Sequence, residues 1–186
     1  MKKNEFLTIP NAVTVLHILL LPILYIFIKN EQWLEAGFLF LFTGFLDLLD
    51  GFLARLLKQF SELGKILDPI ADKLGNIIVL IFLLDLTGNI TYKIVFGIFL
   101  SIELFLGFAT GYVIFKRETK KFQITVLGKI SMFIFFLMLN AFIFNLKFQS
   151  QIGYMILFCL AILLAPVRLY CLTRYILDFF EKQSSL

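Results

Sequence analysis

Residues 33–57 read WLEAGFLFLFTGFLDLLDGFLARLL, an apolar run of membrane-spanning length that carries two aspartates near its end. A helix that crosses the hydrocarbon core of a bilayer needs about 20 mostly apolar residues. An ionised Asp inside that core costs roughly 2.5–3.5 kcal/mol on insertion scales. The stretch therefore predicts a membrane helix in which Asp47 and Asp50 are functional residues.

The composition of the whole chain also favours a helical membrane protein. Of its 186 residues 60% are hydrophobic and 16% are charged, whereas a soluble domain has about 25% charged residues. Such hydrophobicity excludes disorder. The continuous apolar runs argue against a transmembrane barrel, whose strands alternate polar and apolar residues. We expect an all-α, polytopic protein in which residues 1–186 form a single membrane domain.

Six apolar stretches predict six transmembrane helices, and short polar segments separate them. Residues 1–10 are predicted as a short amphipathic segment, either a helix on the membrane surface or a frayed terminus. With six spans, 14 of the 17 Lys and Arg residues fall on the side that holds both termini. That bias predicts that both termini are cytoplasmic. The membrane we expect is a bacterial-type inner membrane. The predicted spans are residues 11–28, 33–57, 66–86, 92–115, 125–146 and 152–175.

The third span carries two further aspartates, Asp68 and Asp72. Residues three or four apart share a helix face, so each span presents its pair on one side. Asp47 and Asp50 lie roughly 20–25 Å along the second span, and the third span runs back from there. Four carboxylates should therefore meet near the cytoplasmic face, at a cost on the order of 10 kcal/mol.

A water-filled cavity, basic partners or bound cations must offset that cost. Carboxylate oxygens suit Mg²⁺, Mn²⁺ or Ca²⁺. Two divalent ions would neutralise four carboxylates, and such a pair suits displacement at the phosphorus of a pyrophosphate.

The residues around these acids have a fixed spacing. The pattern is Asp47-x2-Asp50-Gly51-x2-Ala54-Arg55-x8-Gly64-x3-Asp68-x3-Asp72. It resembles the signature of the CDP-alcohol phosphotransferases, and all eight fixed positions match. The resemblance implies transfer of a phosphatidyl group from CDP-diacylglycerol to an alcohol, with release of CMP, in phospholipid biosynthesis.

The resemblance also implies site residues and partners. Asp47, Asp50, Asp68 and Asp72 would hold two Mg²⁺ or Mn²⁺ ions, and Asp72 would also be the catalytic general base. Homodimers are typical of the family, and no nucleic acid partner is expected. The residues implied to bind the CDP-lipid are Thr14, Gly51, Ala54, Arg55, Ser61 and Gly64.

Two further runs, Pro10-Asn11-x2-Thr14 and the segment from Leu67 to Lys73, resemble the phosphatidylglycerophosphate synthases and the related cardiolipin synthases. The expected acceptor is sn-glycerol 3-phosphate. Phosphatidylglycerol, as in a cardiolipin synthase, or another alcohol is the alternative.

Three basic residues of that subgroup are replaced in this chain. His17 stands in place of Arg, Ile102 in place of the Arg of an Arg-Glu pair, and Ser131 in place of the second Lys of a Gly-Lys-x-Lys-Thr run. We interpret His17 as a packing or interfacial residue. The expected acceptor-binding residues are Lys129, which is retained, and Arg168 and Arg174 of the last span as substitutes.

Two other readings remain open. Intramembrane acids also mark ion and proton pathways, so a coupled transporter or channel is an alternative. The acids cluster at one end of two helices, however, and trace no path across the bilayer. A family member that keeps the fold but has lost turnover is the second alternative, because of the missing basic residues.

Overall fold

The computed structural model describes the backbone of residues 8–59, 61, 64–115 and 126–183. The side chains of residues 65, 66, 68, 69, 110, 112–115 and 175–183 are outside this description. The predicted amphipathic segment of residues 1–10 lies almost wholly outside it. Only its last residues are described, and Ile9 and Pro10 already belong to the first helix.

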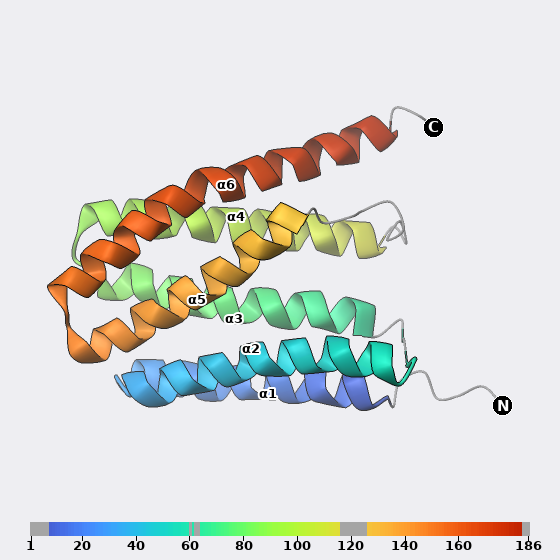
Figure 1. Ribbon diagram of the computed structural model, residues 1–186, viewed down its shortest axis with the longest axis horizontal. Coiled ribbons are helices and arrows are strands. Elements are labelled where there is room, and N and C mark those ends of the chain that lie inside the picture. The colour runs from blue at the N-terminus through green and yellow to red at the C-terminus, as the bar shows by residue number, and fades with distance from the viewer. Residues whose placement is uncertain (1–7, 60, 62–63, 116–125, 184–186) are drawn as a thin grey trace.

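The described part of the chain forms six helices and contains no strand, in agreement with the predicted all-α class (Figure 1). The first helix begins two residues before the predicted span because Thr8 caps it: the Asn11 N–H donates to Thr8 Oγ1 at 3.3 Å. The helices are α1 (Ile9–Lys29), α2 (Trp33–Leu56), α3 (Gly64–Leu86), α4 (Ile90–Phe115), α5 (Val126–Phe148) and α6 (Gln151–Gln183).

Five of these helices are long and apolar enough to cross a membrane, namely α1, α2, α4, α5 and α6. The chain is therefore an integral membrane protein. The remaining helix, α3, has 23 residues, and at 1.5 Å per residue it is long enough for a core about 30 Å thick. It is also the helix with Asp68, Asp72 and Lys73 in its first half. These charged residues belong to the candidate site that α3 helps to form.

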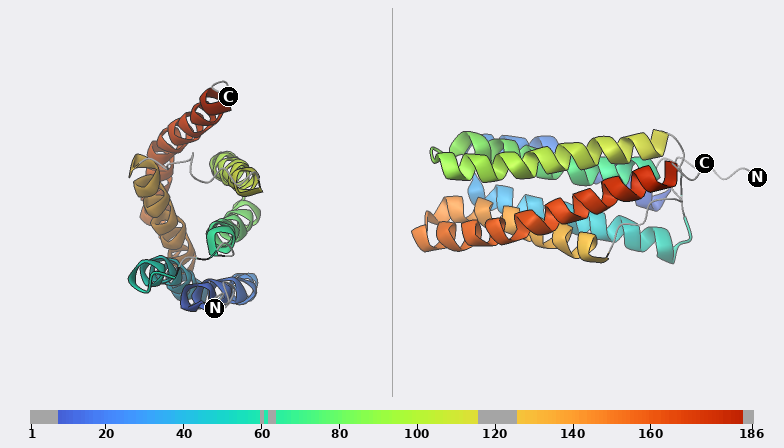
Figure 2. Two further views of the ribbon diagram at one scale, coloured as in Figure 1. Left: turned by 90° about the vertical axis from the view of Figure 1, so that its right-hand side faces the viewer. Right: turned by 90° about the horizontal axis from the view of Figure 1, so that it is seen from above.

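Successive helices run antiparallel, so the start of α1 and the end of α6 lie at the same end of the bundle (Figure 1). We call this the terminal end. The helices pack in a ring in which α2 contacts α5 and α4 contacts α6. Seen along the bundle, α3 and α4 lie on one side, α5 and α6 on the other, and α1 and α2 along the base (Figure 2). This order is not the order of the sequence.

Aromatic and aliphatic side chains fill the interior of the ring. Leu24, Leu80 and Leu139 are fully buried, and the Phe99 and Phe135 rings stack with centroids 4.8 Å apart. Large apolar residues also cover the outside, as expected where lipid is the solvent. Close packing and polar contacts between helices, rather than burial from water, must then hold the bundle together.

Two glycines let α2 approach α5 closely. A Cβ at Gly37 would lie 2.8 Å from the Phe144 ring, and one at Gly44 would lie 2.3 Å from Phe136 Cζ. Next to these notches the Asn140 side chain donates a 2.9 Å hydrogen bond to the Gly37 carbonyl. These contacts fix the rotation of α2, and with it the direction in which its aspartates face.

Candidate active site

The structure brings the aspartate-bearing segments of α2 and α3 to the terminal end of the bundle, as the antiparallel spans predict (Figure 1). Asp50 is buried with 3% of its surface exposed, while Asp47 and Asp72 are half-buried. Asp68 lies on α3, one turn before Asp72, but its side chain is outside the described residues. The acidic segments of two helices thus lie at the same depth.

A hydrogen bond from α1 orients one of these acids. The Thr14 hydroxyl lies 2.8 Å from Asp50 Oδ2 and 3.2 Å from the Pro10 carbonyl, and both Thr14 and Asp50 are buried. The shorter contact takes the single hydroxyl proton, because a bond to a charged acceptor is the stronger one. Thr14 therefore fixes the Asp50 carboxylate relative to α1.

A second polar cluster joins the start of α1 to the start of α3. The Ser61 hydroxyl donates to Asn11 Oδ1 at 2.7 Å and accepts from the Gly64 N–H at 2.8 Å. A Cβ at Gly64 would lie 2.8 Å from Asn11 Oδ1, so only glycine fits without displacing a neighbour. Ser61 thus satisfies the first backbone N–H of α3 and joins the start of this helix to α1.

The other glycine of the signature has open space above it. Among the described side chains, a Cβ at Gly51 would meet only the Arg55 guanidinium, at 4.0 Å. Arg55 is exposed, and its Nε donates to the Gly51 carbonyl at 2.9 Å. Ala54 is half-buried on the same turns. Packing against the described residues therefore does not require glycine at 51, and on that side there is room for a ligand.

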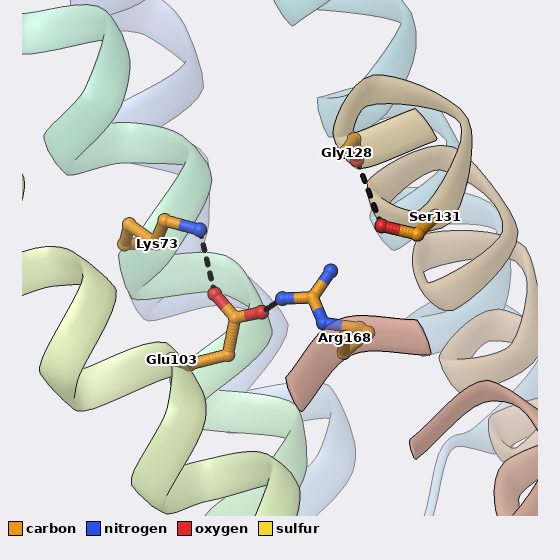
Figure 3. A network of polar contacts seen from close by, with 5 residues as sticks. All are labelled: Lys73, Glu103, Gly128, Ser131 and Arg168. Carbon is orange, nitrogen blue, oxygen red and sulfur yellow. Dashed lines mark hydrogen bonds and ion pairs between the residues drawn. The ribbon is translucent and has the colours of Figure 1, made fainter. Parts of the chain in front are cut away.

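A buried ion-pair network links three helices. Glu103 of α4 is fully buried between two cations, Lys73 of α3 and Arg168 of α6 (Figure 3). Lys73 Nζ lies 2.7 Å from Glu103 Oε2, and the Arg168 guanidinium donates to the other carboxylate oxygen. The Arg168 guanidinium also lies 4.5 Å from the centre of the Phe135 ring. The network carries one surplus positive charge.

Asp72 is the acid that faces this surplus. It acts electrostatically on Lys73 and on Arg168, and also on His17 of α1. With Asp72 ionised, its charge and those of Glu103, Lys73 and Arg168 sum to zero. This neutrality lowers the free-energy cost of keeping the four groups away from water. Glu103 and Lys73 were not among the site residues predicted from the sequence, and the structure places both beside Asp72 through this network. The available signal was charge inside predicted membrane helices.

The three residues expected to bind the acceptor differ in burial and in ion pairing. Arg168 is buried and paired with Glu103. Lys129 of α5 and Arg174 of α6 are exposed and form no ion pair within the part of the chain that is described. Ser131, where a second lysine was expected, is buried and donates to the Gly128 carbonyl at 2.8 Å.

The donor set suits a hard cation, because it consists of carboxylate oxygens from two neighbouring helices. Among the side chains described, no three His, Cys, Asp or Glu residues are close enough together to hold a metal ion. Asp68, whose side chain is not described, lies outside that comparison. The fit to a metal therefore rests on the chemistry of the aspartates and on their shared depth.

Comparison with known proteins decides the family. A model of the family described as CDP-alcohol phosphatidyltransferase matches residues 7–167, which include all four aspartates. The chain belongs to the CDP-alcohol phosphatidyltransferase family. The family match ends one residue before Arg168. The contact of Arg168 with Glu103 is thus made by a residue just beyond the matched region.

Named members of this family show which activities its relatives carry. A CDP-diacylglycerol–glycerol-3-phosphate 3-phosphatidyltransferase of Pseudomonas fluorescens is 41% identical over 87 residues, 45% of each chain. That of Aquifex aeolicus is 42% identical over 67 residues, 36% of this chain and 38% of its own. A CMP-forming cardiolipin synthase of Rattus norvegicus is 46% identical over 67 residues, 36% of this chain and 22% of its own. The chain spans less than half the length of each relative.

Proposed function

We propose that the protein transfers a phosphatidyl group from CDP-diacylglycerol to an alcohol, with sn-glycerol 3-phosphate as the acceptor and CMP as the leaving group. The observation that carries this proposal is the pairing of the α2 and α3 acidic segments at one end of the bundle, with Asp50 held by Thr14. The family match and the named relatives support the same chemistry.

Asp72 is the proposed general base. It takes the proton of the acceptor hydroxyl, whose oxygen then bonds to the β-phosphorus of the CDP-lipid. The bond between that phosphorus and the CMP oxygen breaks, and CMP leaves with the electron pair.

Asp47, Asp50, Asp68 and Asp72 would hold two Mg²⁺ or Mn²⁺ ions. The positive charge of these ions would offset the negative charge of the pyrophosphate. Thr14 orients Asp50 for this role. The open space above Gly51 and the exposed Arg55 guanidinium suit the phosphates of the CDP-lipid, because Arg binds phosphate oxygens in pairs. Ser61, Gly64 and Ala54 complete the proposed nucleotide side.

The acceptor side is proposed to use Lys129, Arg168 and Arg174. Arg168 has the strongest support, because it is paired with Glu103 near Asp72 and its guanidinium can bind the phosphate oxygens of an anionic headgroup. Lys129 and Arg174 would attract the same headgroup from exposed positions.

We also propose the membrane arrangement and assembly that the sequence implies. In it α3 is a sixth span, the terminal end faces the cytoplasm of a bacterial-type inner membrane, and the protein forms homodimers. The start of α1 and the end of α6 lie at one end of the bundle, and this and the lysine and arginine bias support the arrangement.

A second candidate acceptor is phosphatidylglycerol, as in a CMP-forming cardiolipin synthase. Two observations favour it: the similarity to the rat enzyme of that name, and the presence of Ile102 and Ser131 where basic residues were expected. Fewer cations suit a phosphodiester, which carries one negative charge, better than a phosphomonoester, which carries two.

The test is product analysis with purified protein. The protein in nanodiscs receives labelled CDP-diacylglycerol, Mg²⁺ or Mn²⁺, and either glycerol 3-phosphate or phosphatidylglycerol, and the lipid product is identified by mass. We expect phosphatidylglycerophosphate and CMP, and an Asp72→Asn variant that binds CDP-lipid without turnover. Release of no CMP with either acceptor would contradict the proposal. Formation of cardiolipin instead would replace the acceptor and keep the chemistry.

A further inference from the structure

The end of the bundle opposite the terminal end contains a cavity of about 360 Å³, beside the turns that join α3 to α4 and α5 to α6 (Figure 1). Ligand-binding cavities in proteins span about 300–1,000 Å³, so this one is large enough for a ligand. Leu83 in its wall lies eleven residues beyond Asp72, roughly 16 Å along α3. The cavity is therefore separate from the candidate active site.

The cavity changes from polar to apolar between its exposed and its buried lining. Asn89 and Gln151, which belong to the turns, are exposed, whereas Leu83, Phe96 and Phe142 are buried. None of the described residues that line the cavity carries a charge. A charged group bound against the apolar walls would lose its hydration without gaining a partner. The inner part of the cavity therefore suits an uncharged, apolar group.

Two tyrosines bring hydroxyl groups to the same cavity. Tyr92 of α4 and Tyr154 of α6 both line it, and Tyr92 acts electrostatically on Tyr154, so their hydroxyl groups lie near each other. Neither hydroxyl has a hydrogen-bond partner among the described residues. The Tyr92 ring is positioned by Phe158, which meets it edge-on with centroids 4.6 Å apart. Two donors on neighbouring helices thus face one cavity with their hydrogen bonds unused within the described chain.

A single chemical group fits both tyrosines. A carbonyl oxygen has two lone pairs and can accept a hydrogen bond from each of two hydroxyl groups. In a phospholipid an ester carbonyl stands at the head of each acyl chain, so one ligand combines this acceptor with an apolar chain. The depth also agrees, because Tyr92 and Tyr154 lie in the first turn of the spans that begin at Ile90 and Gln151. Tyrosines at the ends of spans lie at the level of the lipid headgroups.

We infer that this cavity binds one acyl chain of a membrane phospholipid, whose ester carbonyl accepts hydrogen bonds from the Tyr92 and Tyr154 hydroxyls. The chain extends from the turns toward the centre of the bundle, in the direction of the acyl chains in the leaflet at this end. The lipid occupies a site distinct from the one proposed for CDP-diacylglycerol. The inference does not depend on the proposed phosphatidyl transfer.

Two variants test the site, each with a matched control. The double variant Tyr92→Phe with Tyr154→Phe removes both hydroxyls and keeps both rings. Its control is Tyr25→Phe, because Tyr25 packs against α3 near the same end of the bundle but lies outside the cavity lining. Leu86→Trp adds bulk at an exposed residue of the lining. Its control is Ile81→Trp, at an exposed residue of the same helix outside the lining.

The probe is dioleoyl phosphatidylcholine, which has no free hydroxyl group and so cannot act as the acceptor alcohol. A form with a photoreactive diazirine on one acyl chain is crosslinked to the protein in detergent micelles, and the labelled residues are identified by mass spectrometry. We expect label on the buried walls of the cavity. Unlabelled diester lipid should compete about tenfold better than the dialkyl ether analogue, which lacks the carbonyl groups.

In the double tyrosine variant the diester lipid should lose its advantage over the ether lipid, Leu86→Trp should abolish the label, and both controls should match the wild type. Equal competition by the two lipids on the wild-type protein would overturn the inference, and this comparison needs no substituted protein. Label confined to the lipid-facing outside of the bundle would also overturn it. So would losses in Tyr25→Phe or Ile81→Trp as large as those in the variants that they control.

Discussion

Thr14 on α1 donates a 2.8 Å hydrogen bond to Asp50 on α2, and both side chains are buried. This contact connects two helices at the terminal end of the bundle and fixes one acid of the signature. A buried carboxylate needs such donors because its charged form loses hydration on burial. The bond therefore fixes the orientation of the Asp50 carboxylate relative to α1.

Replacing Thr14 by Val should lower activity by at least about tenfold, because a hydrogen bond to a charged group contributes about 1.5–3 kcal/mol. The concentration of Mg²⁺ or Mn²⁺ at half-maximal CMP release should rise. Thr14→Ser keeps the hydroxyl and should retain most of the wild-type rate. The measurement is CMP release across a metal titration. A Val variant with the wild-type metal dependence would show that Thr14 does not support the acidic site.

Replacing Glu103 by Gln should destabilise the protein strongly, because it leaves Lys73 and Arg168 buried without their shared carboxylate. Breaking a buried ion pair costs about 3–5 kcal/mol. For a chain of this size that corresponds to a melting temperature lower by roughly 6–20 °C. Thermal unfolding in detergent measures the shift, and Glu35→Gln, at an exposed position, serves as the control.

The double variant Glu103→Gln with Arg168→Gln removes one anion and one cation together. It should be more stable than Glu103→Gln alone, since fewer unbalanced charges remain in the interior. If the losses from the two single changes simply add, the network is not energetically coupled.

The features that could be predicted from the sequence are local. An apolar run of about 20 residues indicates a membrane helix by itself, so all six helices were predicted in the correct order. Their ends were less accurate where other forces act. The start of α1 is set by the Thr8 cap, and α6 continues to Gln183, beyond the apolar run, in residues whose hydropathy no longer indicates a span.

Contacts between distant residues could not be predicted in the same way. Glu103 carries a charge inside a predicted span, where acids usually pair with basic residues, and the structure pairs it with two. Nothing local identified Arg168, 65 residues away, or Lys73 as its partners. The pairing depends on α4 lying between α3 and α6 in the ring, an order that the packing of the folded helices determines. The role of the aspartates as metal ligands stays a prediction.

Replacing Gly64 by Ala should disturb the connection between α2 and α3. The new Cβ would lie 2.8 Å from Asn11 Oδ1 and 3.1 Å from Ser61 Oγ, so the hydrogen bond between these two groups would have to move. We expect a loss of about 1–3 kcal/mol in stability and a weaker affinity for CDP-lipid. Gly97→Ala on α4, where a Cβ has open space, is the control.

Melting temperature and CDP-lipid binding are measured for both alanine variants. Adding Asn11→Ala to Gly64→Ala removes the oxygen that the methyl group meets, and should restore part of the stability. A Gly64→Ala variant with unchanged melting and unchanged binding would contradict the assigned role of this glycine.

Replacing Gly44 by Ala should separate α2 from α5. The added Cβ would lie 2.3 Å from Phe136 Cζ, and the Phe136 ring packs against Phe40 with centroids 4.7 Å apart, so it has little room to retreat. Overpacking of this kind costs about 1–3 kcal/mol. Because Asp47 follows one turn later on α2, the shift should also reduce CMP release by more than the loss of folded protein explains.

A compensating change tests the cause. Phe136→Leu shortens the side chain that fills the Gly44 notch, so the double variant Gly44→Ala with Phe136→Leu should recover stability and CMP release together. Gly107→Ala on α4 has open space around its Cβ and should change neither. Recovery of stability without recovery of CMP release would mean that α2 supports the bundle through this notch but does not position its acids through it.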